Sequence, residues 1–192
     1  TIDYGRKDAV IGEWLKGPGT DFFEVLKNRL GKDPAIIAED LGTITDAVRA
    51  LLKFSGFPGM KVMQFGFDPD NDSEYLPHNF VKNSVAYIGT HDNDTLIGWY
   101  EQESENVKRF INKYLRLSEK EGLTWGFINS LLASVSDIAI ISMQDLLGLG
   151  SEARMNIPST LGGNWQWRMK SMDCLTDDLK NRLKDSTSIY KR

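Results

Sequence analysis

Cysteine and histidine are scarce in this chain of 192 residues, which contains one cysteine and two histidines. Because Cys174 has no second cysteine to pair with, an intrachain disulfide is impossible and a zinc site built on several thiolates is excluded. A chain without disulfides fits a reducing compartment, and the first residues show no signal-peptide pattern. We therefore expect a cytoplasmic location.

Excess positive charge and long apolar runs are also lacking. The formal net charge is -4, whereas nucleic acids and anionic membranes bind basic surfaces. No apolar run approaches the length that spans a bilayer. We therefore expect neither nucleic acid nor a membrane as a partner. The composition, 41% hydrophobic and 26% charged, is that of a globular protein, and 192 residues suffice for one domain with a substantial core.

Short apolar runs alternate with longer helical patterns, as in β/α units around a parallel sheet. The runs predicted to be strands are 35–38, 61–65, 85–88 and 138–141. The predicted helices are 20–30, with Thr20 as its cap, 45–54, 96–115, 124–136 and 176–183. A closed (β/α) barrel needs about eight strands. The periodicity therefore predicts an α/β fold that is either half of such a barrel or a small open sheet.

Polar residues follow each predicted strand. In chain order they are Glu39 and Asp40, then Asp68, then the Thr-His-Asp-Asn-Asp-Thr segment at 90–95, and last Gln144 and Asp145. Because parallel strands have their carboxyl ends at one edge, where β/α barrels place their active sites, we expect these groups to converge there. Two carboxyl groups facing a sugar are the minimum for cleaving a glycosidic bond, and aromatic side chains such as Phe65, Trp99 and Tyr100 could line the sugar subsites.

The local pattern leaves some of these assignments open. Glu39 and Asp40 are adjacent, so in an extended chain they point to opposite sides, and the pattern does not decide which one faces the site. Such a pair is also common in loops and helix caps, and Phe65 at a strand end is a usual core residue. The segment around His91 is different, because a core position would not tolerate so many polar side chains without partners. We interpret that segment as functional.

Several longer motifs, in this order along the chain, resemble those of the amylomaltases, glycoside hydrolase family 77. They are Ile-Ala-Glu-Asp-Leu-Gly at 37–42, Phe-Pro-Gly-Met-Lys-Val at 57–62, Tyr-Leu-Pro-His-Asn at 75–79 and Gly-Thr-His-Asp-Asn-Asp-Thr at 89–95. Further segments extend the resemblance over nearly the whole chain, at 14–19, at 150–156 with Pro158, and at 164–165. The resemblance implies transfer of α-1,4-glucan segments between maltodextrins by a retaining double displacement.

The resemblance also implies roles for individual residues. Glu39 matches the general acid/base, and Asp92 matches a carboxylate that stabilises the transition state by gripping the sugar. His91 matches a residue that binds ring hydroxyls, and Phe65 matches an aromatic wall beside the acceptor. The residues assigned to substrate binding are His91, Phe65, Asp68 and Asn156. The implied partner is an α-1,4-glucan or maltooligosaccharide, and no metal or organic cofactor is implied.

The family's nucleophile, an aspartate in an Arg-Ile-Asp-His type of segment, has no counterpart here. Asp3 lies in a superficially similar segment but aligns beyond the nucleophile. The resemblance therefore places residues 1–192 in the C-terminal half of a (β/α)8 barrel, strands five to eight, and predicts no activity for this chain alone. A half barrel exposes sheet edges, so self-association is expected. The alternatives are a non-catalytic carbohydrate-binding or structural module and a metal-dependent hydrolase built on His91 and Asp92.

Overall fold

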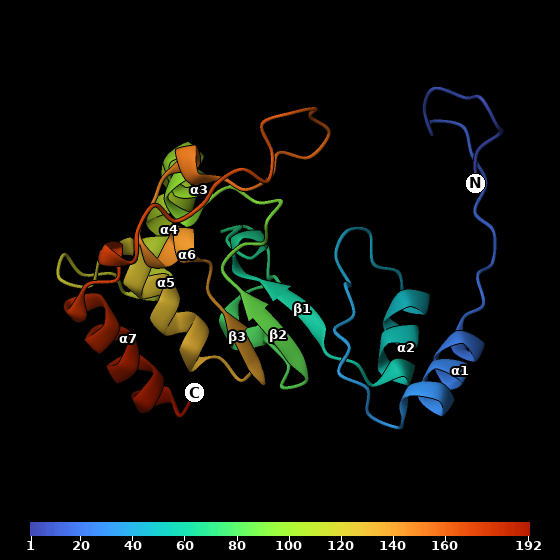
Figure 1. Ribbon diagram of the computed structural model, residues 1–192, viewed down its shortest axis with the longest axis horizontal. Coiled ribbons are helices and arrows are strands. Elements are labelled where there is room, and N and C mark those ends of the chain that lie inside the picture. The colour runs from blue at the N-terminus through green and yellow to red at the C-terminus, as the bar shows by residue number, and fades with distance from the viewer. The chain divides into compact units, whose positions relative to one another are not determined.

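The computed structural model describes all 192 residues, and the chain divides into two compact units, Thr1–Phe57 and Pro58–Arg192. The first unit contains α1 (Thr20–Leu30) and α2 (Asp46–Ser55), and the second contains three strands and the remaining helices (Figure 1). None of the helices combines the length and the apolar character that crossing a membrane requires.

Helices α1 and α2 pack against each other in the first unit. Helix α2 begins after Thr45, whose hydroxyl accepts a hydrogen bond from Val48 N, and such a cap satisfies an amide that the helix leaves unpaired. The cap of α1 is Gly19, so the prediction of Thr20 as the cap was wrong. Gly19 has φ 57° and ψ -130°, a backbone conformation that is open to glycine but not to threonine.

Residues 35–38 do not form a β-strand, so this prediction was also wrong. Their side chains alternate between exposed and half-buried, and Ile37 is 45% exposed. A β-strand is defined by hydrogen bonds to a neighbouring strand, and the first unit contains no strand that could pair with this segment. The side chains of residues 35–38 alternate as they do in a strand, but the segment lacks the backbone hydrogen bonds to a neighbouring strand.

The second unit is built on a parallel sheet in the order β1-β2-β3, with β1 at Gly59–Val62, β2 at Ser84–Tyr87 and β3 at Ile138–Ile140 (Figure 1). The predicted α/β class is confirmed by these three strands. Strand β1 begins and ends earlier than predicted, because Met63–Phe65 form a 3-10 turn. In that turn Gln64 N donates to Ile88 O at 3.1 Å, and Gly66 N donates back to Met63 O.

One face of the sheet is covered by helices. Ala86 of β2 belongs to a core shared with α3 (Leu96–Gln102), α4 (Glu105–Leu115) and α5 (Gly122–Ala133). Helix α5 packs against α3 and α4, and also against α6 (Met143–Leu146) and α7 (Asp177–Tyr190). The long helix predicted for 96–115 is two helices, because Ser104 accepts a hydrogen bond from Val107 N and starts α4 there.

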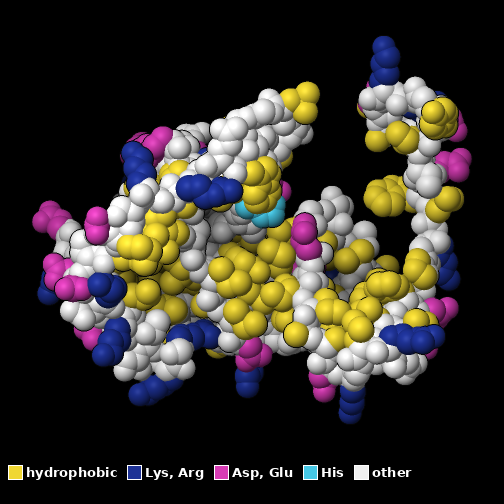
Figure 2. Space-filling model, viewed as in Figure 1, with side chains coloured by type: hydrophobic (Ala, Val, Ile, Leu, Met, Phe, Trp, Pro, Cys, Tyr) yellow, Lys and Arg dark blue, Asp and Glu magenta, His cyan; other side chains and the backbone are white.

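The opposite face of the sheet is apolar and partly open. Its side chains are Met60, Val62, Val85, Tyr87, Ile138 and Ile140, in matching positions on the three strands. Val62 and Val85 are fully buried, whereas Ile138 and Ile140 are 44% and 42% exposed. Hydrophobic side chains gather over β1 to β3 in Figure 2. Parallel sheets are normally covered on both faces, so this face is suited to packing against further structure.

Candidate functional site

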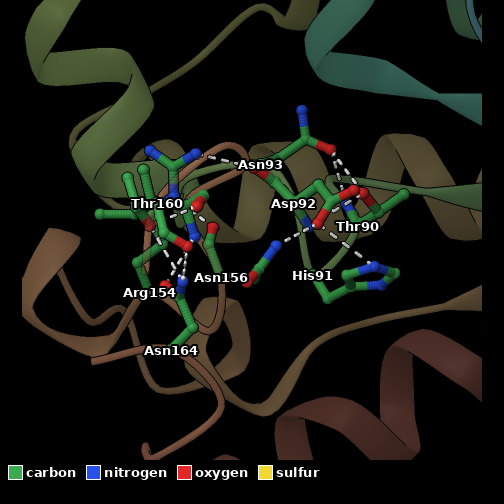
Figure 3. Close-up of polar contacts among 9 residues, drawn as sticks. Thr90, His91, Asp92, Asn93, Arg154, Asn156, Thr160 and Asn164 are labelled. Carbon is green, nitrogen blue, oxygen red and sulfur yellow. Dashed lines mark hydrogen bonds and ion pairs between the residues drawn. The ribbon is translucent and has the colours of Figure 1, made fainter. Parts of the chain in front are cut away.

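The turn that follows β2 carries His91 and Asp92, and its own side chains order it. Asn93 Oδ1 accepts hydrogen bonds from Thr90 N at 2.9 Å and from Thr90 Oγ1 at 2.8 Å. Thr90 Oγ1 in turn accepts from Asp92 N at 3.3 Å (Figure 3). With the amides of Thr90 and Asp92 bonded inside the turn, the segment presents the Asp92 side chain half-exposed to solvent.

Two side chains point at the Asp92 carboxylate. His91 Nε2 lies 3.3 Å from Asp92 Oδ1, and Asn156 Nδ2 donates to the same oxygen at 2.6 Å (Figure 3). Asn156 comes 64 residues later in the chain, so the fold brings it to the turn. A carboxylate, an imidazole and an amide in contact offer both acceptors and donors to the hydroxyl groups of a sugar. Three of the residues predicted for the site, His91, Asp92 and Asn156, therefore lie together.

The segment that carries Asn156 holds the turn at further points. The Arg154 guanidinium donates to the backbone oxygen of Asp92 at 2.7 Å and to that of Asn156 at 2.9 Å. Ser151 Oγ donates to Asp94 Oδ2 at 2.6 Å. Sequence reasoning missed Arg154 and Ser151 as site residues, although both lie in the motif at 150–156. They fix the position of Asp92 through the backbone and through its neighbour Asp94.

Asp145 lies near the segment at 90–95, as expected, but Gln144 and Asp145 are both buried and are not open to a ligand. Asp145 is 2% exposed, and its Oδ1 accepts a hydrogen bond from Leu96 N at 2.7 Å. Burial raises the pKa of the Asp145 carboxyl, although the Leu96 hydrogen bond opposes the change. Gln144 Nε2 donates to Ala153 O at 3.2 Å inside the second unit. Both side chains support the start of α3 and the turn at Ser151–Ala153.

Phe65 and Asp68 lie in the segment that follows β1, and both are exposed. The Phe65 ring meets the edge of Tyr75 at 5.6 Å between centroids. Asp68 accepts hydrogen bonds from Asn71 Nδ2 at 2.6 Å and from Asp70 N at 3.0 Å. These two bonds, the Asn71 bond first, lower the pKa of the Asp68 carboxyl. Phe65 and Asp68 make these contacts with their own segment, so their role in substrate binding stays a prediction.

Glu39 belongs to the first unit, at the end of the extended segment that begins at Ala35. Its side chain is exposed, whereas that of the adjacent Asp40 is half-buried. Of the two acids, Glu39 is therefore the one that is open to a ligand. The catalytic role of Glu39, and its action together with Asp92, stay predictions.

No group of three or more histidine, cysteine, aspartate or glutamate side chains is arranged to hold a metal ion. The groups around the Asp92 turn include the Asn156 amide and the Arg154 guanidinium. A guanidinium carries a positive charge and cannot be a ligand. The alternative of a metal-dependent hydrolase therefore finds no ligand set in His91 and Asp92.

Comparisons with known proteins agree with the resemblance seen in the motifs. The profile of a family described as 4-alpha-glucanotransferase matches residues 1–175. The chain is 48% identical to the 4-alpha-glucanotransferase of Clostridium butyricum, covering 100% of this chain and 39% of that protein. It is 46% identical to the chloroplastic/amyloplastic 4-alpha-glucanotransferase of Solanum tuberosum, covering 97% of this chain and 33% of that protein.

Solved structures give the same result for the fold. The amylomaltase of Streptococcus agalactiae in complex with acarbose superposes with a TM-score of 0.90 at 44% identity, over 94% of this chain and 36% of that chain. The amylomaltase of Corynebacterium glutamicum shares the fold with a TM-score of 0.57 at 15% identity, over 80% of this chain and 29% of that chain. The chain spans 39% or less of the length of each of these proteins.

Proposed function

The chain belongs to the 4-alpha-glucanotransferase family, glycoside hydrolase family 77, and from this premise we propose that it supplies part of a glucan-transferring active site. The activity is proposed for a longer protein, because the chain spans 39% of the Clostridium butyricum relative. That activity is the transfer of α-1,4-glucan segments between maltodextrins. Residues 1–192 are proposed to be the C-terminal half of a (β/α)8 barrel, with the extended segment 35–38 in the place of strand five and β1 to β3 as strands six to eight. The parallel order β1-β2-β3 and the open apolar face of the sheet support this placement.

The contact of Asp92 with His91 and Asn156 is the observation that carries the proposal. Asp92 Oδ1 is held by the Asn156 amide and faces His91 Nε2. A carboxylate fixed in this way grips sugar hydroxyls without having to be ordered when the sugar binds. Hydrogen bonds that strengthen as the ring distorts lower the barrier to cleavage of the glycosidic bond.

Glu39 is proposed as the general acid/base of a retaining mechanism. It protonates the glycosidic oxygen of the departing glucan while a carboxylate nucleophile, which has no counterpart in residues 1–192, bonds to the anomeric carbon. Glu39 then takes the proton from the 4-hydroxyl of an acceptor glucan as that oxygen displaces the nucleophile. Two inversions leave the α configuration unchanged. Because this chain has no residue that matches the nucleophile, we propose that it is inactive by itself.

Phe65 and Asp68 are proposed to bind the acceptor side of the glucan. Phe65 is 47% exposed, and Tyr75 supports its ring from the side, which leaves aromatic surface free for the apolar face of a glucose unit. Asp68 is exposed and already accepts two hydrogen bonds from its own turn, so its carboxylate is held in place. The related amylomaltase was solved with acarbose, which supports a ligand of this class.

Two further properties are part of the proposal. The open apolar face, with Ile138 and Ile140 exposed on the edge strand β3, is expected to drive self-association of the isolated chain. The cytoplasmic location also stays a prediction, because the names of plant relatives place those proteins in chloroplasts and amyloplasts.

Binding and turnover of maltooligosaccharides test the proposed function. The purified chain is expected to bind maltoheptaose in a calorimetric titration and to release no glucose from maltotriose. The variant D92N should bind about tenfold or more weakly, because a hydrogen bond to a charged group contributes about 1.5–3 kcal/mol. D72N is the matched control, since Asp72 is an exposed aspartate bonded to Asn79 at 2.7 Å.

Turnover of maltotriose by this chain would contradict the proposed inactivity. Equal affinity of D92N and D72N for maltoheptaose would remove Asp92 from the sugar site. The variant E39Q distinguishes the proposed transferase from a second candidate function, a carbohydrate-binding module without chemistry. This candidate is favoured by the lack of a residue matching the nucleophile. A longer protein that contains this chain and keeps its full transfer activity with E39Q would support the module and exclude Glu39 as the acid/base.

A further inference from the structure

Trp165 stands beside the Asp92 turn as an exposed aromatic side chain. Its ring centroid lies 4.9 Å from that of His91, with the two ring planes 39° apart. The residue is nevertheless 53% exposed. Part of the indole therefore rests on the imidazole, whose Nε2 contacts Asp92, while the larger part stays open to a ligand. Trp165 belongs to a segment that resembles the family, but none of the roles assigned above uses this residue.

The backbone holds Trp165 in a conformation that is uncommon for a bulky residue. Its φ is 64°, in the left-handed region that side chains other than those of glycine, asparagine and aspartate rarely adopt. Trp165 N donates to Met155 O at 2.7 Å, which ties the residue to the segment that carries Asn156. Such outliers persist only where the surrounding structure enforces them, and they cluster at ligand sites.

The loop at 157–164 is braced in a way that presents Trp165. Asn164 Oδ1 accepts from Ile157 N at 2.9 Å, and Asn164 Nδ2 donates to Thr160 Oγ1 at 2.9 Å (Figure 3). Gly162 and Gly163 both have positive φ, 81° and 75°, where glycine alone is relaxed. These contacts close the loop on itself. An aromatic side chain that is fixed before binding loses less entropy when a ligand arrives.

We propose that Trp165 is a sugar-stacking residue that binds the apolar face of a glucose ring whose hydroxyls meet Asp92 and Asn156. This inference rests on the proposed function and adds a binding residue to it. A pyranose ring has an apolar C–H face and a rim of hydroxyls, so it needs an aromatic surface next to hydrogen-bonding groups. Trp165 supplies the surface, and the Asp92 carboxylate and the Asn156 amide supply acceptors and donors. The ligand class is an uncharged α-linked glucose unit.

Titration of the chain with maltoheptaose, followed by NMR, tests this assignment. The chain has only two histidines, so the ring signals of His91 are read against those of His78, whose Nδ1 lies 2.7 Å from the Tyr114 hydroxyl. We expect the His91 signals to move and those of His78 to stay. We also expect nuclear Overhauser effects between the Trp165 indole and sugar C–H protons, a direct contact that a merely structural tryptophan would not give.

Three variants measure the contribution to affinity. W165A should bind maltoheptaose about tenfold more weakly, the upper end for one aromatic stacking contact. W165F keeps an aromatic face and should retain most of the affinity. W167A is the matched control, because Trp167 is a half-buried tryptophan two residues further on, and it should bind like the parent chain. If W165A does not fold, W165F and the Overhauser effects in the parent chain still decide the question.

Three outcomes would overturn the inference. Unchanged affinity in W165A, without Overhauser effects in the parent chain, would remove Trp165 from the binding site while the D92N result keeps the proposed function intact. W165A could bind more weakly although the parent chain shows no indole–sugar contact. If the His91 signals of W165A are then displaced before sugar is added, Trp165 only positions His91. Absence of maltoheptaose binding by the parent chain would overturn the inference together with the proposed sugar site.

Discussion

Replacing Asp145 with asparagine tests the physical account of the second unit, because this acid is buried beneath the start of α3. Asp145 is 2% exposed, and its Oδ1 accepts the hydrogen bond of Leu96 N at 2.7 Å. Burial raises its pKa above the ordinary value of 3.8, and the nearby Asp94 adds to the effect. Asparagine keeps an oxygen for Leu96 N and removes the charge, so D145N isolates the cost of ionisation.

The sign of the pH dependence follows from the raised pKa. Between the unfolded pKa of 3.8 and the higher folded pKa, the folded chain binds more protons than the unfolded chain. The free energy of unfolding therefore falls as the pH rises through this window, and it stays lower above it. The loss is about 1.4 kcal/mol for each pH unit between the two pKa values. D145N lacks this loss, so its stability relative to the parent should increase from acid to neutral pH.

Urea unfolding measures this pH dependence of stability. It is carried out on the parent, D145N and D145A at pH values from below 3.8 to neutral. D145A leaves Leu96 N without its acceptor and should be about 1–3 kcal/mol less stable than D145N across the range. D137N is the surface control, because Asp137 is exposed. A difference between D145N and the parent that does not change with pH would refute the reasoning. A parent chain that gains stability relative to D145N as the pH rises would show that the folded chain favours the ionised carboxylate.

Two further predictions concern stability and assembly. The Arg192 guanidinium donates to the carbonyls at and beyond the end of α5, namely Leu132 O at 3.0 Å, Ser134 O at 2.6 Å and Ser136 O. R192A should therefore lower the free energy of unfolding by about 1–3 kcal/mol. Urea unfolding beside K191A as a control checks this, and equal stability of the two variants would contradict it. Light scattering should give a mass above the 21.7 kDa of one chain, and the double variant I138D/I140D should reduce it, because two charges on the open face oppose burial. A monodisperse monomer of the parent chain would refute self-association.

The sequence predicts most elements of the second unit because their signals are local. The apolar runs of β2 and β3 and the caps of the helices lie within a few residues of the elements they define. Residues 35–38 carry the same kind of apolar run, yet they form no strand. Strand formation depends on a partner elsewhere in the chain, and a local pattern contains no information about that partner.

Some residues of the candidate site could likewise be predicted from local sequence, and others could not. His91, Asp92 and Asn156 could be assigned from motifs, and the structure brings these three together. Arg154 was missed because it acts on a backbone oxygen, a contact that no side-chain pattern encodes. Trp165 depends on a positive φ and on a ring contact across the fold. Asp145 follows a strand as an active-site acid does, but its place at the start of α3 buries it, and only tertiary packing decides between the two positions.

A crystal structure of the chain with a bound maltooligosaccharide measures the central claim most directly. The account predicts one glucose unit whose hydroxyls contact Asp92 and Asn156, with the Glu39 carboxyl at a glycosidic oxygen of the same sugar chain. Sugar bound away from Asp92, or electron density that places Glu39 and Asp92 at opposite ends of the sheet, would contradict the account.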